Sequence, residues 1–157
     1  MGNRLSLSLS LVVVLLLGLT TIWSTVPSLF WIQFMFICLG VLIAVTLRKI
    51  DPRILASFSW PMYIMTILLL LVTLFFGQNI RGSSRWLVIG PLNLQPSELA
   101  KPFLAIFFAD YIARNSLKSI TSTLIFLILA SLPVYLIKVQ PDLGSALVIA
   151  ALALSHL

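Results

Sequence analysis

Long apolar runs separated by short polar connections dominate the sequence and limit what the chain can fold into. Each complete run is about 18 to 22 residues long, enough for a helix to cross a hydrocarbon core of about 30 Å. Backbone amides in lipid must be bonded internally, and the alternation typical of barrel strands is not visible, so the runs are predicted helices. The predicted class is an all-α polytopic membrane bundle with five complete spans and an incomplete sixth, at residues 5–23, 29–47, 55–76, 96–113, 120–137 and 143–157.

Composition excludes several other classes of protein. Hydrophobic residues make up 61% of the chain and charged residues 9%, whereas soluble domains are about a quarter charged. The net charge of +6 does not predict nucleic-acid binding, because the basic residues are scattered among apolar runs and act better as topology signals. The single cysteine, Cys38, excludes a disulfide framework and a cysteine-rich metal site.

The first run resembles the apolar part of a signal peptide, since Arg4 stands in front of it. No small-residue cleavage site follows cleanly, and Ile22-Trp23 leads straight towards the next run. We therefore interpret it as a retained first helix.

The basic residues predict the orientation of the helices. The densest basic cluster, residues 48–53, is cytoplasmic by the positive-inside rule, which also places the N-terminus inside. Arg114 and Lys118, two connections later, then fall on the same side. The connections at residues 81–95 and 138–142 are predicted to be extracytoplasmic.

Three local patterns at the inner face predict structure. Asp51-Pro52 is typical of a helix start, with aspartate as the cap and proline at the first position. Pro61 lies too deep for a cap, so we expect a kink or an interfacial first turn before the third span. Asp110 and Arg114 are four residues apart on one helix, which predicts a local ion pair.

The polar stretch of residues 81–101 lies between two spans and carries the first candidate site. Glycines punctuate it, so we expect turns there. Trp86 suits the headgroup level of a bilayer. Arg85 beside it is suited either to binding an anionic headgroup or phosphate or to snorkelling towards ordinary lipid.

Glu98 and Lys101 are the charged residues at the start of the fourth span. Glu98 is placed to reach back to the cap amide of its helix and to complement the positive helix end. It also shares a face with Lys101, which predicts a buried ion pair at the outer mouth of the bundle. Pro102 cannot donate to the Glu98 carbonyl, which leaves that oxygen for water, a cation or a substrate hydroxyl. Ionisable residues within a span are functional-site candidates by default.

Asp142 begins the sixth run and is the second candidate. As an isolated pattern it predicts an N-cap. Gly144, Ser145 and Ala146 follow as a small surface that lets another helix approach closely. Because both candidates lie on the same predicted side, the residues alone predict an extracytoplasmic polar site suited to an anionic amphiphile.

The order of motifs along the chain resembles the SEDS family, which includes RodA, FtsW and SpoVE, with RodA the nearest in pattern. The resemblance covers the whole chain and rests on Arg85-Trp86, Gly90, the segment QPSELAK at residues 95–101 and the segment QPDLG at residues 140–144.

The resemblance implies the N-terminal part of a ten-span peptidoglycan glycosyltransferase in the bacterial cytoplasmic membrane. Such an enzyme polymerises lipid II, releases undecaprenyl pyrophosphate and works with a class B penicillin-binding protein in elongation or division. A divalent cation, Mg²⁺ or Mn²⁺, is implied as a possible cofactor. The substrate-binding positions implied by the motifs are Arg85, Gln95, Glu98, Lys101 and Asp142.

The match has two departures. Some members of the family carry arginine where Asn93 stands, so the resemblance does not imply a phosphate contact at that position. The aspartate held to be catalytic in the family lies in a later extracellular loop, which would follow Leu157, so the sequence is expected to be the front part of a longer protein. Two other functions fit the same residues: a lipid II flippase, and a non-enzymatic membrane scaffold that binds a penicillin-binding protein.

Overall fold

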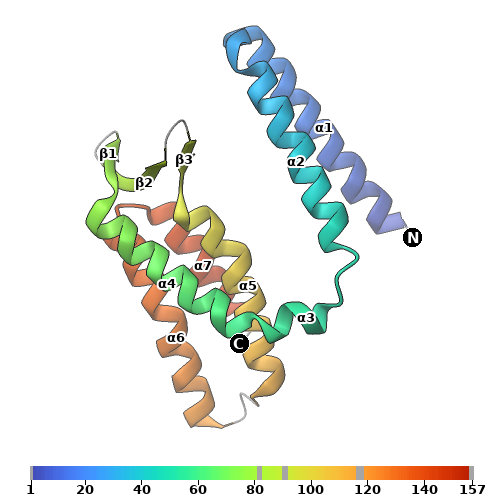
Figure 1. Ribbon diagram of the computed structural model, residues 1–157. Helices are drawn as coiled ribbons and strands as arrows, with labels where there is room; N and C mark the ends of the chain where they lie inside the picture. The colour runs from blue at the N-terminus through green and yellow to red at the C-terminus, as the bar shows by residue number, and fades with distance from the viewer. Residues whose placement is uncertain (1, 81–82, 90–91, 116–118, 156–157) are drawn as a thin grey trace. The chain divides into compact units, whose positions relative to one another are not determined.

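The computed structural model describes residues 2–80, 83–89, 92–115 and 119–155. The chain divides into two compact units, Met1–Asp51 and Pro52–Leu157, which are described separately (Figure 1).

The first unit is a helical hairpin. Helix α1 (Gly2–Thr25) and helix α2 (Phe30–Leu47) are joined by a short 3-10 helix, η1 (Pro27–Leu29). Trp23 and Phe30 meet edge to face across this turn, with ring centroids 4.9 Å apart. No described side chain in the hairpin is buried, so its leucine, valine and phenylalanine side chains face outward, as the surface of a lipid-embedded element does.

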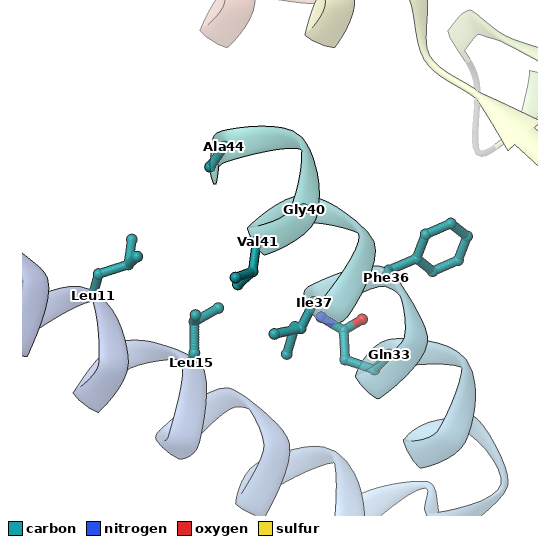
Figure 2. A pocket seen from close by; sticks show the side chains of 8 residues that line it. All are labelled: Leu11, Leu15, Gln33, Phe36, Ile37, Gly40, Val41 and Ala44. Atoms are coloured by element: carbon teal, nitrogen blue, oxygen red, sulfur yellow. The ribbon is translucent and has the colours of Figure 1, made fainter. Parts of the chain in front are cut away.

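A shallow groove of about 400 Å³ runs between α1 and α2 (Figure 2). Gln33 is the polar side chain among those that line it, and it lies beside Ile37. The remaining lining is apolar or small: Leu11, Leu15, Phe36, Gly40, Val41 and Ala44.

The second unit begins with a broken helix. Helix α3 (Pro52–Ser57) and helix α4 (Ser59–Phe76) are separated by the single turn residue Phe58. Pro61 lies in the first turn of α4, where its missing N–H is harmless. The expected irregularity before the third span is confirmed, but the break falls at Phe58 and the long helix begins four residues later than the predicted segment.

Helices α4, α5 (Pro96–Arg114), α6 (Ile120–Val139) and α7 (Leu143–Leu154) form the bundle of the second unit. Aromatic rings pack between three of these helices. Tyr63 of α4 stacks on Phe107 of α5 with ring centroids 4.3 Å apart, and Phe108 of α5 meets Phe126 of α6 edge to face at 5.4 Å. The Tyr63 hydroxyl donates to the Leu129 carbonyl at 3.0 Å, which satisfies a polar group inside the packed interface.

The buried face of α4 is partly polar. Thr66 and Thr73 are buried, and each hydroxyl donates to the carbonyl four residues earlier, at 2.8 and 2.7 Å. Such self-satisfied threonines let polar residues line a helix interface without a partner on another helix. The residues of this face recur every three or four positions, as the packed stripe of a helix requires.

A small antiparallel sheet in the order β1-β2-β3 stands at the end of the bundle where α5 begins (Figure 1). Its strands are β1 (Gln78–Ile80), β2 (Ser83–Ile89) and β3 (Leu92–Leu94). The sequence analysis predicted only turns here. The run Trp86-Leu87-Val88-Ile89, bounded by glycine and proline, carries the apolar and β-branched residues typical of a strand, and this signal was missed.

The all-α multi-pass membrane class is confirmed, with this sheet as an addition. Three helices among the described residues are long and apolar enough to cross a membrane, Pro27–Leu47, Ser59–Phe76 and Ile120–Val139, and two further apolar helices are shorter. Helix α5 covers the fourth predicted span and carries four charged residues, Glu98, Lys101, Asp110 and Arg114.

Candidate functional site

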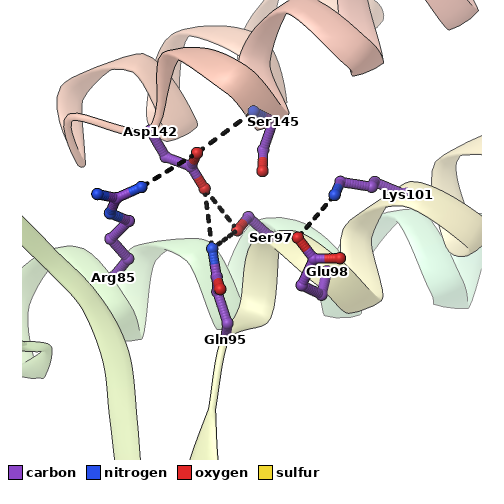
Figure 3. A network of polar contacts seen from close by, with 7 residues as sticks. All are labelled: Arg85, Gln95, Ser97, Glu98, Lys101, Asp142 and Ser145. Carbon is purple, nitrogen blue, oxygen red and sulfur yellow. Dashed lines mark hydrogen bonds and ion pairs between the residues drawn. The ribbon is translucent and has the colours of Figure 1, made fainter. Parts of the chain in front are cut away.

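Asp142 is the centre of the polar network at the sheet end of the bundle (Figure 3). The residue is 5% exposed. Its Oδ2 accepts from the Ser97 hydroxyl at 2.8 Å and from Gln95 Nε2 at 3.1 Å. Its Oδ1 accepts from the Ser145 amide at 3.3 Å and from Arg85 Nη1 at 3.4 Å. A single carboxylate therefore joins β2, the start of α5 and the start of α7.

The local fold explains how distant residues meet there. Pairing of β2 with β3 places Leu87 opposite Leu94, so Arg85 on β2 lies near the residues that open α5. Gln95 is the N-cap residue of α5 in extended conformation, and its side chain bonds both Ser97 in the first turn of that helix and Asp142. Asp142 itself caps α7, which confirms its predicted N-cap role.

The pKa of the Asp142 carboxyl lies below its ordinary value. Burial raises the pKa on its own, but the hydrogen bonds from Ser97, Ser145 and Gln95 outweigh it. Donors aimed at an ionised carboxylate favour the charged form. Asp142 is therefore held as an anion whose oxygens already have partners, which makes it an organiser of the site rather than a base.

Gln140 supports the turn before Asp142. Its side chain is 1% exposed, and its Nε2 donates to the Leu70 carbonyl of α4 at 2.7 Å. The Asp142 amide donates to the Ile137 carbonyl at 3.3 Å. The first bond holds the α6–α7 connection against α4 and the second closes the connection onto α6, so together they fix the position of the carboxylate.

Glu98 and Lys101 form a separate pair one turn along α5. Lys101 Nζ donates to Glu98 Oε1 at 2.6 Å, so the predicted ion pair is present. The prediction that it is buried is wrong for this structure, because the Glu98 side chain is 57% exposed and that of Lys101 30%. Glu98 pairs with Lys101 and not with the cap residue, whose own side chain turns to Asp142.

The structure thus brings together three of the five predicted site residues, Arg85, Gln95 and Asp142, and places Glu98 and Lys101 beside them as an exposed pair (Figure 3). It adds Ser97, Ser145 and Gln140, which the sequence analysis did not select. Ser97 stands between two selected residues in the QPSELAK segment, so its place in the motif was the available signal. Pro102 lies inside α5, so the Glu98 carbonyl has no amide donor four residues later.

Replacing Ser97 by alanine is expected to destabilise the fold. Ser97 is 1% exposed and its hydroxyl donates to a buried carboxylate, and losing such a bond costs about 1.5–3 kcal/mol. The measurement is the midpoint of denaturant unfolding in detergent. Ser131→Ala is the matched control, because its exposed hydroxyl donates only to the Ile128 carbonyl of its own helix. Equal midpoints for the two variants would contradict the central place given to the Asp142 network.

The side chains around Asp142 and Glu98 do not offer a metal ion a set of free ligands. The described part of the chain contains no group of three or more His, Cys, Asp or Glu side chains placed to hold a metal ion. Asp142 is surrounded by donors, and Glu98 is occupied by Lys101. The described residues therefore do not form a metal site of their own.

Comparison with known families and structures gives a consistent result. The family model for FtsW, RodA and SpoVE, described as a cell cycle protein, matches residues 3–157. Peptidoglycan glycosyltransferase MrdB of Escherichia coli K12 is 36% identical over 115 residues, which cover 73% of this chain and 31% of MrdB. A probable peptidoglycan glycosyltransferase FtsW of Nitrosomonas europaea is 37% identical over 131 residues, covering 78% of this chain and 33% of the relative.

Solved structures agree with the sequence matches. The rod shape determining protein RodA of Thermus thermophilus superposes with a TM-score of 0.80 and 32% identity, over 92% of this chain and 49% of RodA. A chain from a peptidoglycan synthase complex that coordinates polymerization and crosslinking superposes with a TM-score of 0.82 and 31% identity, over 92% of this chain and 44% of that one. The chain thus spans less than half the length of each of these relatives.

Proposed function

Because the chain belongs to the FtsW, RodA and SpoVE family, we propose that it forms the outer substrate site of a lipid II polymerase, a peptidoglycan glycosyltransferase. The observation that carries this proposal is the polar network around Asp142, which lies with the Lys101–Glu98 pair at one end of an apolar bundle. Relatives that share this part of the chain are named peptidoglycan glycosyltransferases.

The reaction needs cationic groups near the leaving pyrophosphate. The sugar hydroxyl of the acceptor attacks the anomeric carbon of the donor, and that carbon loses its bond to the lipid pyrophosphate of the donor. Positive groups aimed at the developing negative charge lower the barrier to this step. Lys101 is proposed to stabilise the leaving pyrophosphate, because its side chain is 30% exposed and its partner Glu98 lies at the surface. Arg85 is also partly exposed, at 34%, and is oriented by Asp142.

The base that accepts the hydroxyl proton is not found among the described residues of this site. Asp142 already accepts bonds from four residues, and Glu98 is paired with Lys101. A general base must lie within hydrogen-bond reach of the proton it takes. In the family, an aspartate of a later extracellular loop is held to take this role, and we propose the same role for such an aspartate here.

A divalent cation is proposed to bind here only together with the pyrophosphate of the substrate. Mg²⁺ commonly uses one or two carboxylates together with substrate phosphates. Of the two carboxylates here, Glu98 is the exposed one, so a Mg²⁺ or Mn²⁺ ion would depend mainly on the pyrophosphate oxygens.

The proposed setting is the bacterial cytoplasmic membrane, with the N-terminus in the cytoplasm and the Asp142 network outside. The basic residues at positions 48–53 and 114–118 support this orientation by the positive-inside rule. The proposed partner is a class B penicillin-binding protein, which is supported by the similarity to a chain from a complex of polymerization and crosslinking.

Cysteine labelling of intact cells is expected to place Asn93 and Ser119 on opposite sides of the membrane. Both side chains are exposed, and the charge pattern puts the first outside and the second inside. Asn93→Cys and Ser119→Cys are made with Cys38→Ser and with any further cysteine of the expressed protein replaced by serine, so that only the introduced thiol reacts. A membrane-impermeant maleimide should label only the Asn93→Cys protein. Labelling of both before permeabilisation would overturn the orientation.

The function is tested by supplying purified lipid II to the protein as its gene encodes it, in detergent and in liposomes. A polymerase should form glycan chains in detergent, where no bilayer separates two sides. A flippase should instead move labelled lipid II across the liposome bilayer without forming chains. Binding to a penicillin-binding protein with neither activity would favour the scaffold function and contradict the proposal.

A further inference from the structure

A second polar cluster lies at the opposite end of the second unit and has no part in the proposed function. Asp110 Oδ2 accepts from the Ser59 hydroxyl at 2.6 Å, and its Oδ1 accepts from Arg114 Nε at 2.7 Å. The Asp110 side chain is 8% exposed and that of Arg114 62%. The predicted local ion pair is therefore confirmed, and the hydrogen bond from Ser59 to the same carboxylate ties α5 to the start of α4.

The cluster borders an apolar groove between α3 and α5. The groove has a volume of about 310 Å³, and Asp110 is its charged lining residue. Small side chains open it, because Ala109 and Ala113 follow each other by one turn on α5 and Ala56 faces them from α3. Leu55 and Ile106 complete its apolar walls.

The charges at this groove are arranged to present a cation. The Asp110 side chain is only 8% exposed and is bonded to both Ser59 and Arg114, so the charge that reaches the surface is that of the arginine. The Nε of Arg114 is used by Asp110, and a guanidinium offers further donors on its outer edge. Arg53 adds a second exposed basic residue on α3, next to Pro52, which lines the groove.

We propose that this groove binds an anionic phospholipid, with one acyl chain against the three alanines and the phosphate against Arg114 and Arg53. An apolar channel beside a guanidinium, in a protein that spans the membrane, matches both parts of such a lipid. Planar guanidinium groups meet phosphate oxygens with two parallel donors, and basic pockets between helices at the cytoplasmic face are typical sites for anionic headgroups. Asp110 acts in this site as the residue that holds the Arg114 guanidinium in place.

The test compares two lipids that differ only in the headgroup. The protein as its gene encodes it is purified in mild detergent and mixed with dioleoyl-phosphatidylglycerol or dioleoyl-phosphatidylcholine, and retained lipid is measured by native mass spectrometry. Phosphatidylglycerol is expected to be retained more strongly by about fivefold per cationic residue involved. Arg114→Gln should reduce this preference by about fivefold, whereas Lys138→Gln, an exposed basic residue at the other end of the bundle, should leave it unchanged.

Filling the groove separates lipid binding from simple charge attraction. Ala109→Phe keeps every charge and occupies the channel, so it should lower retention of both lipids, while glycerol 3-phosphate, which has no acyl chain, should not compete. Unfolding midpoints of all variants show whether the fold is intact. Equal retention of the two lipids by the unaltered protein, or full retention by Ala109→Phe, would overturn the proposal. Full retention by Ala109→Phe would mean that lipid does not occupy the groove, and a protein segment would then be its occupant.

Discussion

Replacing Asp142 by alanine is expected to lower the free energy of unfolding by about 3 kcal/mol and to abolish polymerisation. Asp142 is 5% exposed, and its carboxylate accepts bonds from Ser97, Gln95, Arg85 and the Ser145 amide. Removing one partner from a buried charged network leaves the others unpaired, and this costs about 3–5 kcal/mol when both charges are buried. Arg85 is 34% exposed and can turn to water, so the expected cost lies at the lower end. The measurement is denaturant unfolding in detergent.

The pH dependence of stability tests whether the charge of Asp142 is responsible. The pKa of this carboxyl is lowered in the folded protein, so its contribution is complete above the ordinary aspartate value of about 3.9 and is lost as pH falls through the folded pKa. The Asp142→Asn variant keeps the size of the side chain but has no charge to lose. The stability difference between the unaltered protein and this variant should therefore shrink as pH falls below the ordinary value. A constant difference would show that packing alone accounts for the effect.

The helices could be predicted from the sequence because a segment that crosses a membrane must have a minimum apolar length. Runs such as residues 29–47 and 120–137 are apolar almost without interruption, and a backbone in lipid has few alternatives to the helix. The break at Phe58 was predicted only approximately, because a proline indicates that a helix is disturbed nearby and not at which residue.

The sheet could not be derived from the same reasoning. Strand pairing depends on contacts between segments and on burial of one face, so a short apolar run among glycines is ambiguous by itself. Leu87 pairs with Leu94 and Gln78 with Trp86, and these registers become apparent only when the chain is folded.

The sequence identified most residues of the candidate site but not which of them contact one another. The spacing of Glu98 and Lys101 on one helix correctly predicted that they meet. Their burial was wrongly predicted, since a pair near the start of α5 lies at the surface of this structure. The bond between Ser97 and Asp142 joins residues 45 positions apart, and no periodicity reports such a contact. The sequence alone placed the motifs at residues 95–101 and 140–144 on the same side of the membrane, and it did not show that they touch.

Replacing Lys101 by methionine is expected to reduce lipid II polymerisation by about 100-fold or more while leaving the unfolding midpoint nearly unchanged. A preorganised group that stabilises developing negative charge contributes about this much to rate. The ion pair that would be lost is exposed, with Glu98 at 57%, and exposed pairs contribute about 0–1 kcal/mol to stability. Activity and stability therefore respond very differently if Lys101 serves the substrate.

A cycle of four proteins shows whether Glu98 acts through Lys101 or by itself. Polymerisation and the unfolding midpoint are measured for the unaltered protein, Glu98→Gln, Lys101→Met and the double variant, with Lys138→Met as a control that removes an exposed lysine elsewhere. If Glu98 only positions Lys101, Glu98→Gln has a partial effect, and adding it to Lys101→Met changes nothing further, because the cation is already gone. If Glu98 instead binds a cation together with the pyrophosphate, the two losses multiply and depend on Mg²⁺ concentration. Activity retained in Lys101→Met, or lost equally in Lys138→Met, would remove Lys101 from the substrate site.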